Sequence, residues 1–323
     1  PKAAPQRRPW LGWVAAAAGV GVGLGLLAGH YLGLGAAGPL DSTVSRWSLT
    51  PPPGTAWGSV PAVSPDGRRL AFVGVQGQRA QLYVQPVDGR EATPLAGTDG
   101  AMNPFWSSDS RRIGFLAARP GVIASLELRV VAPDGVVGPA LWSGLGRGAA
   151  FTGDGDVVIG SGREGLLRAG PSGGPPSPVL ALTRERLEFG QRWPALLPDG
   201  RHMLFFSWAS PDEHRGVYVA RVDLPPDQQQ PQLVLRGDSN ALVVAGDSAS
   251  PPLIVFERDA TLYAQPFDAR SFSTSGTPVA LERGVGRLNP DHPAQFSASP
   301  DVLVAGPDVP FAVSADGAHV AWV

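Results

Sequence analysis

The feature that most constrains this chain is an aspartate that returns at nearly constant intervals, each time between two apolar runs. The steps from Asp66 to Asp109, Asp154, Asp199 and Asp247 are 43, 45, 45 and 48 residues. A period of about 40 to 50 residues with four short strands per unit is typical of a propeller blade. One such sheet cannot bury both of its faces alone, so the repeat predicts blades stacked around an axis.

The clearest unit shows the order of strands and turns within one blade. It contains the runs AVSPDGRRLAFV at 62–73, QLYVQPV at 81–87 and EATPL at 91–95, with a second Asp-Gly turn at 88–89. Asp and Gly adopt the backbone angles of tight hairpin turns at little cost. We therefore assign a turn role, rather than a catalytic one, to the recurring residues Asp66, Gly67, Asp109, Asp154, Gly155, Asp199 and Gly200.

The end of the chain departs from this period. A sixth unit opens at 296–301, and another Asp-Gly turn at 316–317 follows about 15 residues after Asp301. These spacings predict an all-β, six-bladed-type β-propeller over 61–323 whose last blade is incomplete. A strand within 44–49 would close the ring by pairing with that blade, since an open ring exposes strand edges.

The N-terminal segment predicts a membrane anchor. Residues 10–34 contain no Asp, Glu, Lys or Arg, and about 20 apolar residues span a bilayer as a helix. Basic residues precede this segment, so the positive-inside rule predicts a cytoplasmic flank at 1–9, a linker at 35–60 and an extracytoplasmic propeller. A cleaved signal peptide is the alternative interpretation. Because the chain begins with Pro1, we expect it to be a fragment or a processed product.

Four glycines in the predicted membrane helix share one face. They are Gly21, Gly25, Gly29 and Gly33, a spacing that permits close helix–helix contact and favours a homodimer in the membrane. The alternative is that glycine is simply frequent in this chain, which contains 42 glycines.

Composition excludes several chemistries. The chain has no cysteine, so disulfides, thiolate metal sites and cysteine nucleophiles are excluded. A net charge of −2 without a basic stripe argues against nucleic acid as a partner. The five histidines are scattered without metal-ligand spacing, so we assign no catalytic, cofactor-binding or metal-binding residue.

Two further patterns favour structural interpretations. The sequence GPSGG at 170–174 fits the G-x-S-x-G pattern of hydrolases, but it falls where other units place a turn. The tryptophans Trp106, Trp142, Trp193 and Trp208 are interpreted as blade-packing residues rather than a ligand cage.

The units resemble the WD40-like PD40 repeats of TolB-type propellers. The apolar segment, the run RWSLTPPPG at 46–54 and the runs QLYVQPV at 81–87 and RWPALLPDGRH at 192–202 also resemble the C-terminal half of bacterial membrane serine/threonine protein kinases. This resemblance implies a kinase domain upstream of Pro1. The chain itself has no Gly-rich loop, His-Arg-Asp or Asp-Phe-Gly sequence that would bind ATP.

Three functions follow as expectations. The first is a sensory propeller that binds an extracytoplasmic ligand or protein and belongs to a membrane-anchored kinase. The second is a membrane-anchored, TolB-like scaffold for protein partners. The third is the propeller domain of a hydrolase. The fold alone cannot choose among them.

Overall fold

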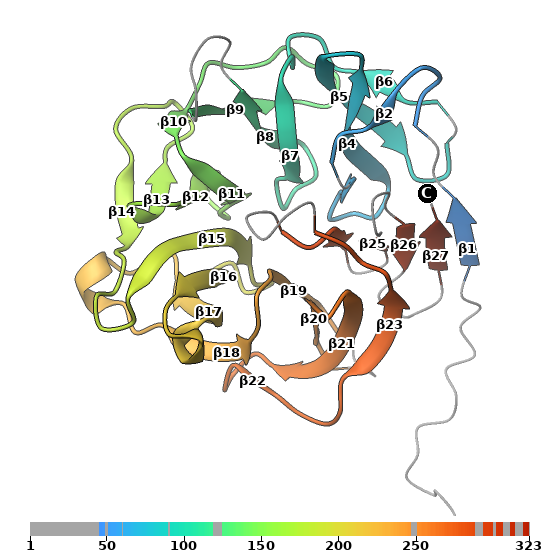
Figure 1. Cartoon of the computed structure of the whole chain (residues 1–323). Coiled ribbons are helices and arrows are strands. Elements are labelled where there is room, and N and C mark those ends of the chain that lie inside the picture. Colours follow the sequence, from blue (N-terminus) through green and yellow to red (C-terminus); the bar gives the residue numbers. More distant parts are fainter. Residues whose placement is uncertain are drawn as a thin grey trace, which may run out of the picture. The chain divides into compact units, whose positions relative to one another are not determined.

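The computed structural model describes most of the chain after residue 50. The described residues are 51–59, 61–89, 91–118, 125–246, 251–287, 293–299 and 302–305, together with the backbone of three short strands at 45–48, 311–313 and 319–322. Their compact unit comprises Thr43–Val323. Within it the strands form sheets that follow one another around a centre (Figure 1).

Five sheets are built wholly from described residues, and each contains four or five strands. The first contains β2 (Ala56–Trp57), β3 (Ala62–Val63), β4 (Arg69–Gln76), β5 (Arg79–Pro86) and β6 (Thr93–Pro94). The second contains β7 (Ala101–Trp106), β8 (Ile113–Ala118), β9 (Leu126–Val131) and β10 (Trp142–Gly144). The third contains β11 (Gly146–Phe151), β12 (Val157–Ser161), β13 (Gly165–Ala169) and β14 (Ser177–Leu180).

The remaining sheets continue the same order. The fourth contains β15 (Glu188–Leu196), β16 (His202–Ala209), β17 (Gly216–Arg221) and β18 (Gln232–Arg236). The fifth contains β19 (Ala241–Val244), β20 (Leu253–Arg258), β21 (Thr261–Asp268), β22 (Ser273–Thr274) and β23 (Val279–Arg283). A sixth sheet of three- and four-residue strands contains β24 (Phe296–Ala298), β25 (Leu303–Ala305), β26 (Phe311–Val313), β27 (His319–Trp322) and β1 (Ser45–Ser48).

The sixth sheet joins segments from the two ends of the unit. β1 pairs in parallel with β27, with Ser45 opposite His319 and Ser48 opposite Trp322. The other pairings in this sheet are antiparallel. β1 lies within the segment that was expected to close the ring.

The expected fold class is wrong. We predicted a six-bladed-type propeller with an incomplete last blade behind a transmembrane helix. The described residues support an all-β propeller with five complete blades, followed by a sixth sheet of short strands that includes β26 and β27. In the described part of the chain the helical elements are two 3₁₀ turns, η1 (Asp212–His214) and η2 (Pro226–Gln228).

No helix within these described ranges is long and apolar enough to cross a membrane. Turns follow one another too closely in these ranges to leave room for such a helix. The longest described strand has nine residues, whereas a helix that spans a membrane needs about 20. The segment 10–34, where the spanning helix was predicted, lies outside the described residues.

The apolar core lies between neighbouring sheets. One cluster of buried side chains joins the first and second sheets, and others join each following pair, ending with Val63 and Leu70 of the first sheet against Val302 and Val304 of the sixth. The largest buried side chains lie on the central strands, among them Phe72, Phe115 and Phe205. Each sheet therefore depends on its two neighbours to remove its faces from water.

A buried carboxylate in the fourth sheet holds the glutamine that bonds to the third sheet. Glu188 accepts hydrogen bonds from Ser207 Oγ at 2.7 Å, Gln191 Nε2 at 3.0 Å and Arg186 Nη2 at 2.9 Å. The Gln191 Oε1 atom in turn accepts the backbone N–H of Leu166 in β13 at 3.0 Å. Burying a charge is costly unless it is paired and hydrogen-bonded, and both conditions are met at Glu188.

The recurring aspartates at 66, 109, 154 and 199 lie in the turns that join β3 to β4, β7 to β8, β11 to β12 and β15 to β16. Gly67 N donates to Ser64 O at 2.8 Å, and Gly200 N donates to Leu197 O at 3.0 Å. The turn glycines are left-handed, with φ of +68° at Gly67 and at Gly200. A type I turn followed by a left-handed residue is a common three-residue hairpin loop.

The turn carboxylates are held in the same way in three sheets. A hydroxyl two residues before the aspartate donates to it at 2.5 Å, in the pairs Ser64–Asp66, Ser107–Asp109 and Thr152–Asp154. Leu197 replaces this hydroxyl in the fourth sheet. There His202 Nδ1 lies 2.5 Å from Asp199 and supplies the missing contact.

We expect Gly200→Ala to lower the free energy of unfolding by about 1 kcal/mol, because an L side chain is strained at a positive φ. No heavy atom lies within 4 Å of an added Cβ at Gly200, so the cost comes from the backbone alone. Gly153→Ala is the matched control, because its Cβ would also meet open space and its φ is not left-handed. Urea unfolding of the two variants checks this; equal losses would contradict it.

We expect Asp109 to contribute to the loss of stability of the fold at acid pH. Donation by Ser107 Oγ, followed by that of the Arg111 N–H, holds the pKa of the Asp109 carboxyl below its ordinary value of 3.8. A carboxylate with a lowered folded pKa stabilises the protein above its unfolded pKa, and this stabilisation is lost as the pH falls through the folded pKa. We therefore expect stability to fall between about pH 5 and pH 3 less steeply in Asp109→Asn than in the wild type.

Urea unfolding at several pH values in this range measures that slope. Ser107→Ala removes one donor and keeps the titrating group, so its slope should lie between those of the wild type and Asp109→Asn. An Asp109→Asn slope equal to that of the wild type would exclude this role.

Candidate functional site

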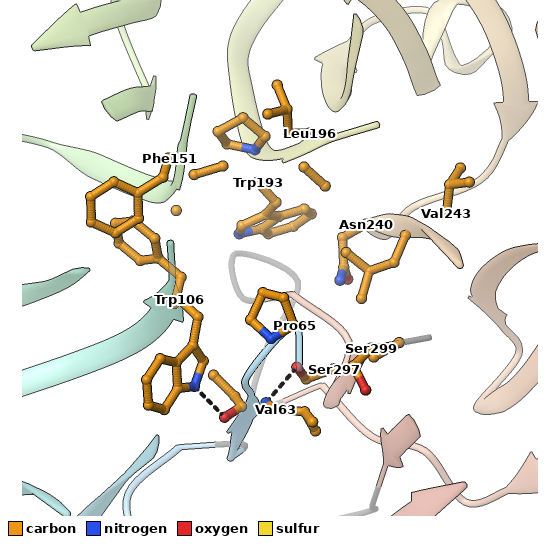
Figure 2. Close-up of a pocket in the computed structure, with 18 of the residues that line it drawn as sticks. Val63, Pro65, Trp106, Phe151, Trp193, Leu196, Asn240, Val243, Ser297 and Ser299 are labelled. Carbon is orange, nitrogen blue, oxygen red and sulfur yellow. Dashed lines mark hydrogen bonds between the residues drawn. The ribbon is translucent and has the colours of Figure 1, made fainter. Parts of the chain in front are cut away.

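A cavity of about 630 Å³ lies at the centre of the sheets. Its wall is formed by residues on or beside the inner strands β3, β7, β11, β15, β19 and β24, so every sheet contributes to it. Figure 2 shows Phe151 and Trp106 on one side of this space, Asn240, Ser297 and Ser299 on the other, and Trp193 between Phe151 and Asn240. Ligand pockets in proteins commonly have volumes of about 300 to 1,000 Å³.

Three inner strands are shaped by the same irregularity. β7, β11 and β15 each slip register against the next strand, and each slip contains a residue with left-handed backbone. These residues are Asn103 (φ 50°), Gly148 (φ 84°) and Trp193 (φ 49°). All three stand six residues before the turn aspartate of their sheet and line the cavity. The bulge therefore places one equivalent residue from each of the three sheets at the wall.

Trp193 is the unusual member of this set. A bulky residue with positive φ is a genuine outlier, and such strain persists only where its surroundings fix it. The Trp193 ring is buried and stacks on Phe206, with centroids 5.2 Å apart. The neighbouring Gly148 lets it approach, because a Cβ at Gly148 would lie 3.0 Å from the Trp193 Cα. The third and fourth sheets thus fit together around Trp193.

Two further aromatic rings of the wall are held from the adjacent sheet. The Arg69 guanidinium lies 5.0 Å from the Trp106 ring centroid, and Arg112 lies 4.9 Å from that of Phe151. Trp106 Nε1 also donates to the Ala62 carbonyl at 2.8 Å. These contacts fix the orientation of two rings that face the cavity.

Among the described residues that line the cavity, Asp199 alone has an ionisable side chain. Burial raises the pKa of its carboxyl, but the backbone N–H and imidazole of His202 and the N–H of Arg201 outweigh this and bring the pKa below its usual value. The carboxylate is therefore ionised at neutral pH, and its oxygens are already occupied by the turn. The His202 ring also packs on Phe272, with centroids 4.6 Å apart.

The residues singled out from the sequence fall into three groups. Asp66, Gly67, Asp109, Asp154, Gly155, Asp199 and Gly200 lie in the turns described above, and Asp199 and Gly200 also line the cavity. The glycines at 21, 25, 29 and 33 lie outside the described residues. The sequence GPSGG at 170–174 is a turn between β13 and β14.

The tryptophans serve more than packing. Trp106, Trp142 and Trp193 are buried between sheets, but Trp106 and Trp193 also line the cavity. The interpretation of these four residues as packing alone is therefore incomplete. Sequence reasoning missed Asn103 and Asn240 as wall residues. Asn103 could have been found from its position before the turn aspartate, whereas Asn240 has no counterpart in the other units.

Within the described ranges, no group of three or more His, Asp or Glu side chains is placed to hold a metal ion. The wall offers aromatic faces, backbone groups, amides and hydroxyls. Such a surface can bind and orient a molecule by stacking and hydrogen bonding.

Comparison with known proteins agrees with this fold. No protein-family model matches the chain. The chain is 29% identical over 152 residues to the uncharacterized peptidase YuxL of Bacillus subtilis (strain 168), a match that covers 45% of this chain and 21% of YuxL.

Two solved structures are similar in shape. TolB from Acinetobacter baumannii superposes with a TM-score of 0.52 and 15% identity, over 69% of this chain and 54% of TolB. The tricorn protease gives a TM-score of 0.53 at 12% identity, over 81% of this chain and 25% of that protein. The chain spans about half the length of TolB and about a fifth of YuxL. It therefore has a TolB-like β-propeller fold, with the tricorn protease among its structural neighbours.

Proposed function

We propose that this propeller is a binding domain that holds a small ligand or a protein segment in its central cavity. The observation that carries the proposal is the wall itself, in which Trp193, Trp106 and Phe151 present aromatic surface at fixed orientations. Trp193 keeps a strained backbone there, and stored strain clusters at ligand sites. Pre-organised aromatic walls reduce the entropy lost on binding.

In its finer form, the proposal links binding to a serine/threonine protein kinase domain in the same gene product. Its support is the sequence resemblance of the runs at 46–54, 81–87 and 192–202. The gene sequence upstream of Pro1 tests this form directly. A kinase domain there, with phosphorylation that changes on ligand addition, is the expected result; any other upstream domain contradicts it.

A second candidate is the propeller domain of a larger hydrolase. The 29% identity with a protein named as a peptidase favours it. In that case the binding cavity would select or admit substrate, and the catalytic residues would lie elsewhere in the parent protein. A hydrolase domain in the complete gene, together with peptide turnover, would support this candidate over the kinase form.

Filling the cavity should abolish binding. Ala195 is a half-buried wall residue on β15, so Ala195→Trp places a large ring inside the cavity. We expect compounds detected by saturation-transfer NMR on the wild type to lose at least about tenfold in affinity for this variant, since displaced contacts of about 1.4 kcal/mol correspond to that factor.

Val136→Trp is the matched control. Val136 is 92% exposed and lies outside the cavity wall, so the same ring is added where it cannot meet a bound molecule. Binding that survives Ala195→Trp, or that is lost equally in both variants, would contradict the cavity as the binding site. The thermal midpoint of each variant without ligand verifies that both are folded.

A further inference from the structure

Asn240 is a buried wall residue whose amide oxygen accepts hydrogen bonds while its amide nitrogen donates none to the described residues. Its side chain is 8% exposed, and its Oδ1 accepts hydrogen bonds from Ala294 N at 2.8 Å and Ser239 Oγ at 2.9 Å. A backbone N–H can only donate, so the atom beside Ala294 must be the amide oxygen. This contact fixes the orientation of the amide and leaves Nδ2 on the opposite side.

The Asn240 amide lies in the cavity wall, and Figure 2 shows it beside Trp193. None of the hydrogen bonds of the described residues uses Nδ2 as a donor. Nδ2 is not one of the enclosed side-chain atoms that lack a partner among the described residues, so water or a molecule bound in the cavity can reach it and accept its hydrogen bond.

The charge of the wall limits what that acceptor can belong to. Asp199 is the ionisable residue among the described residues of the wall, and it already accepts two backbone N–H groups and the His202 imidazole. An anionic ligand would lose its hydration and face the Asp199 carboxylate, whereas a cationic ligand would have to compete with the groups that already hold this carboxylate; both are costly. A neutral ligand avoids these costs.

We propose that the cavity selects an uncharged molecule with an apolar ring and a carbonyl or amide oxygen, and that Asn240 is the residue that recognises this oxygen. Trp193 and Phe151 contact the ring, and one N–H of Asn240 Nδ2 donates to the oxygen. This inference rests on the proposed function, because it names the class of ligand for the same cavity.

Isothermal titration of the full chain with three matched probes tests the selection. N-acetyl-tryptophanamide is neutral, N-acetyl-tryptophan carries a carboxylate and tryptamine carries an ammonium group. We expect the wild type to bind the neutral probe at least tenfold more tightly than either ion. Equal or tighter binding of an ion would overturn the selection for uncharged ligands.

Asn240→Asp tests the role of the amide. The variant keeps the oxygen that accepts from Ser239 and Ala294 and replaces the donating group with an acceptor. We expect a loss of at least tenfold in affinity for N-acetyl-tryptophanamide and a smaller preference over tryptamine. If Asn240→Asp does not fold, Asn240→Ser removes the donor from the cavity and should give the same loss for the neutral probe. Unchanged affinity in a folded variant would overturn the assignment.

The outcomes separate this inference from the function on which it rests. If an ionic probe binds best and Ala195→Trp abolishes its binding, the cavity is a binding site and the inference about neutral ligands is wrong. If none of the three probes binds the wild type, the inference about neutral ligands is wrong. The proposed function fails only if the NMR screen finds no compound whose binding is lost in Ala195→Trp.

Discussion

Apolar burial between neighbouring sheets is the constraint on which the rest of the structure depends. Each sheet has two faces, and the core clusters join one sheet to the next until Val63 and Leu70 meet Val302 and Val304. A single sheet in water would leave both faces exposed, so the units are stable only together. The central cavity is a consequence of this arrangement, because inner strands converge on an axis that their backbones cannot fill.

The polar part of the structure fixes how the inner strands meet that axis. The turn carboxylates hold the hairpins, and the register slips in β7, β11 and β15 direct one left-handed residue per sheet to the wall. Glycine at 148 and tryptophan at 193 are coupled, since the first leaves the space that the second approaches. Hairpin turns therefore provide regularity, and the bulges give the cavity its individual shape.

The sequence was sufficient to predict the β architecture and insufficient to predict the cavity. Periodic aspartates, Asp-Gly turns and short apolar runs are local signals, so the β-strands could be predicted from them, and the structure has turns at 66, 109, 154 and 199. Register slips depend on contacts between sheets, so the role of Trp193 as a wall residue was not visible. The fold class also failed at the chain end, which does not follow the repeat that carried the prediction, and the segment 10–34 lies outside the described residues.

In this molecule, residues that repeat from unit to unit maintain the fold, whereas residues that depart from the repeat bear on function. A residue that returns in several units performs the same structural task each time, as the turn hydroxyls at 64, 107 and 152 do. A residue that appears once must be explained by its own surroundings. Trp193 stands where the other sheets have Asn103 and Gly148, and Asn240 has no counterpart. Since a propeller fold serves many functions, these unrepeated wall residues, rather than the fold, determine what the cavity can recognise.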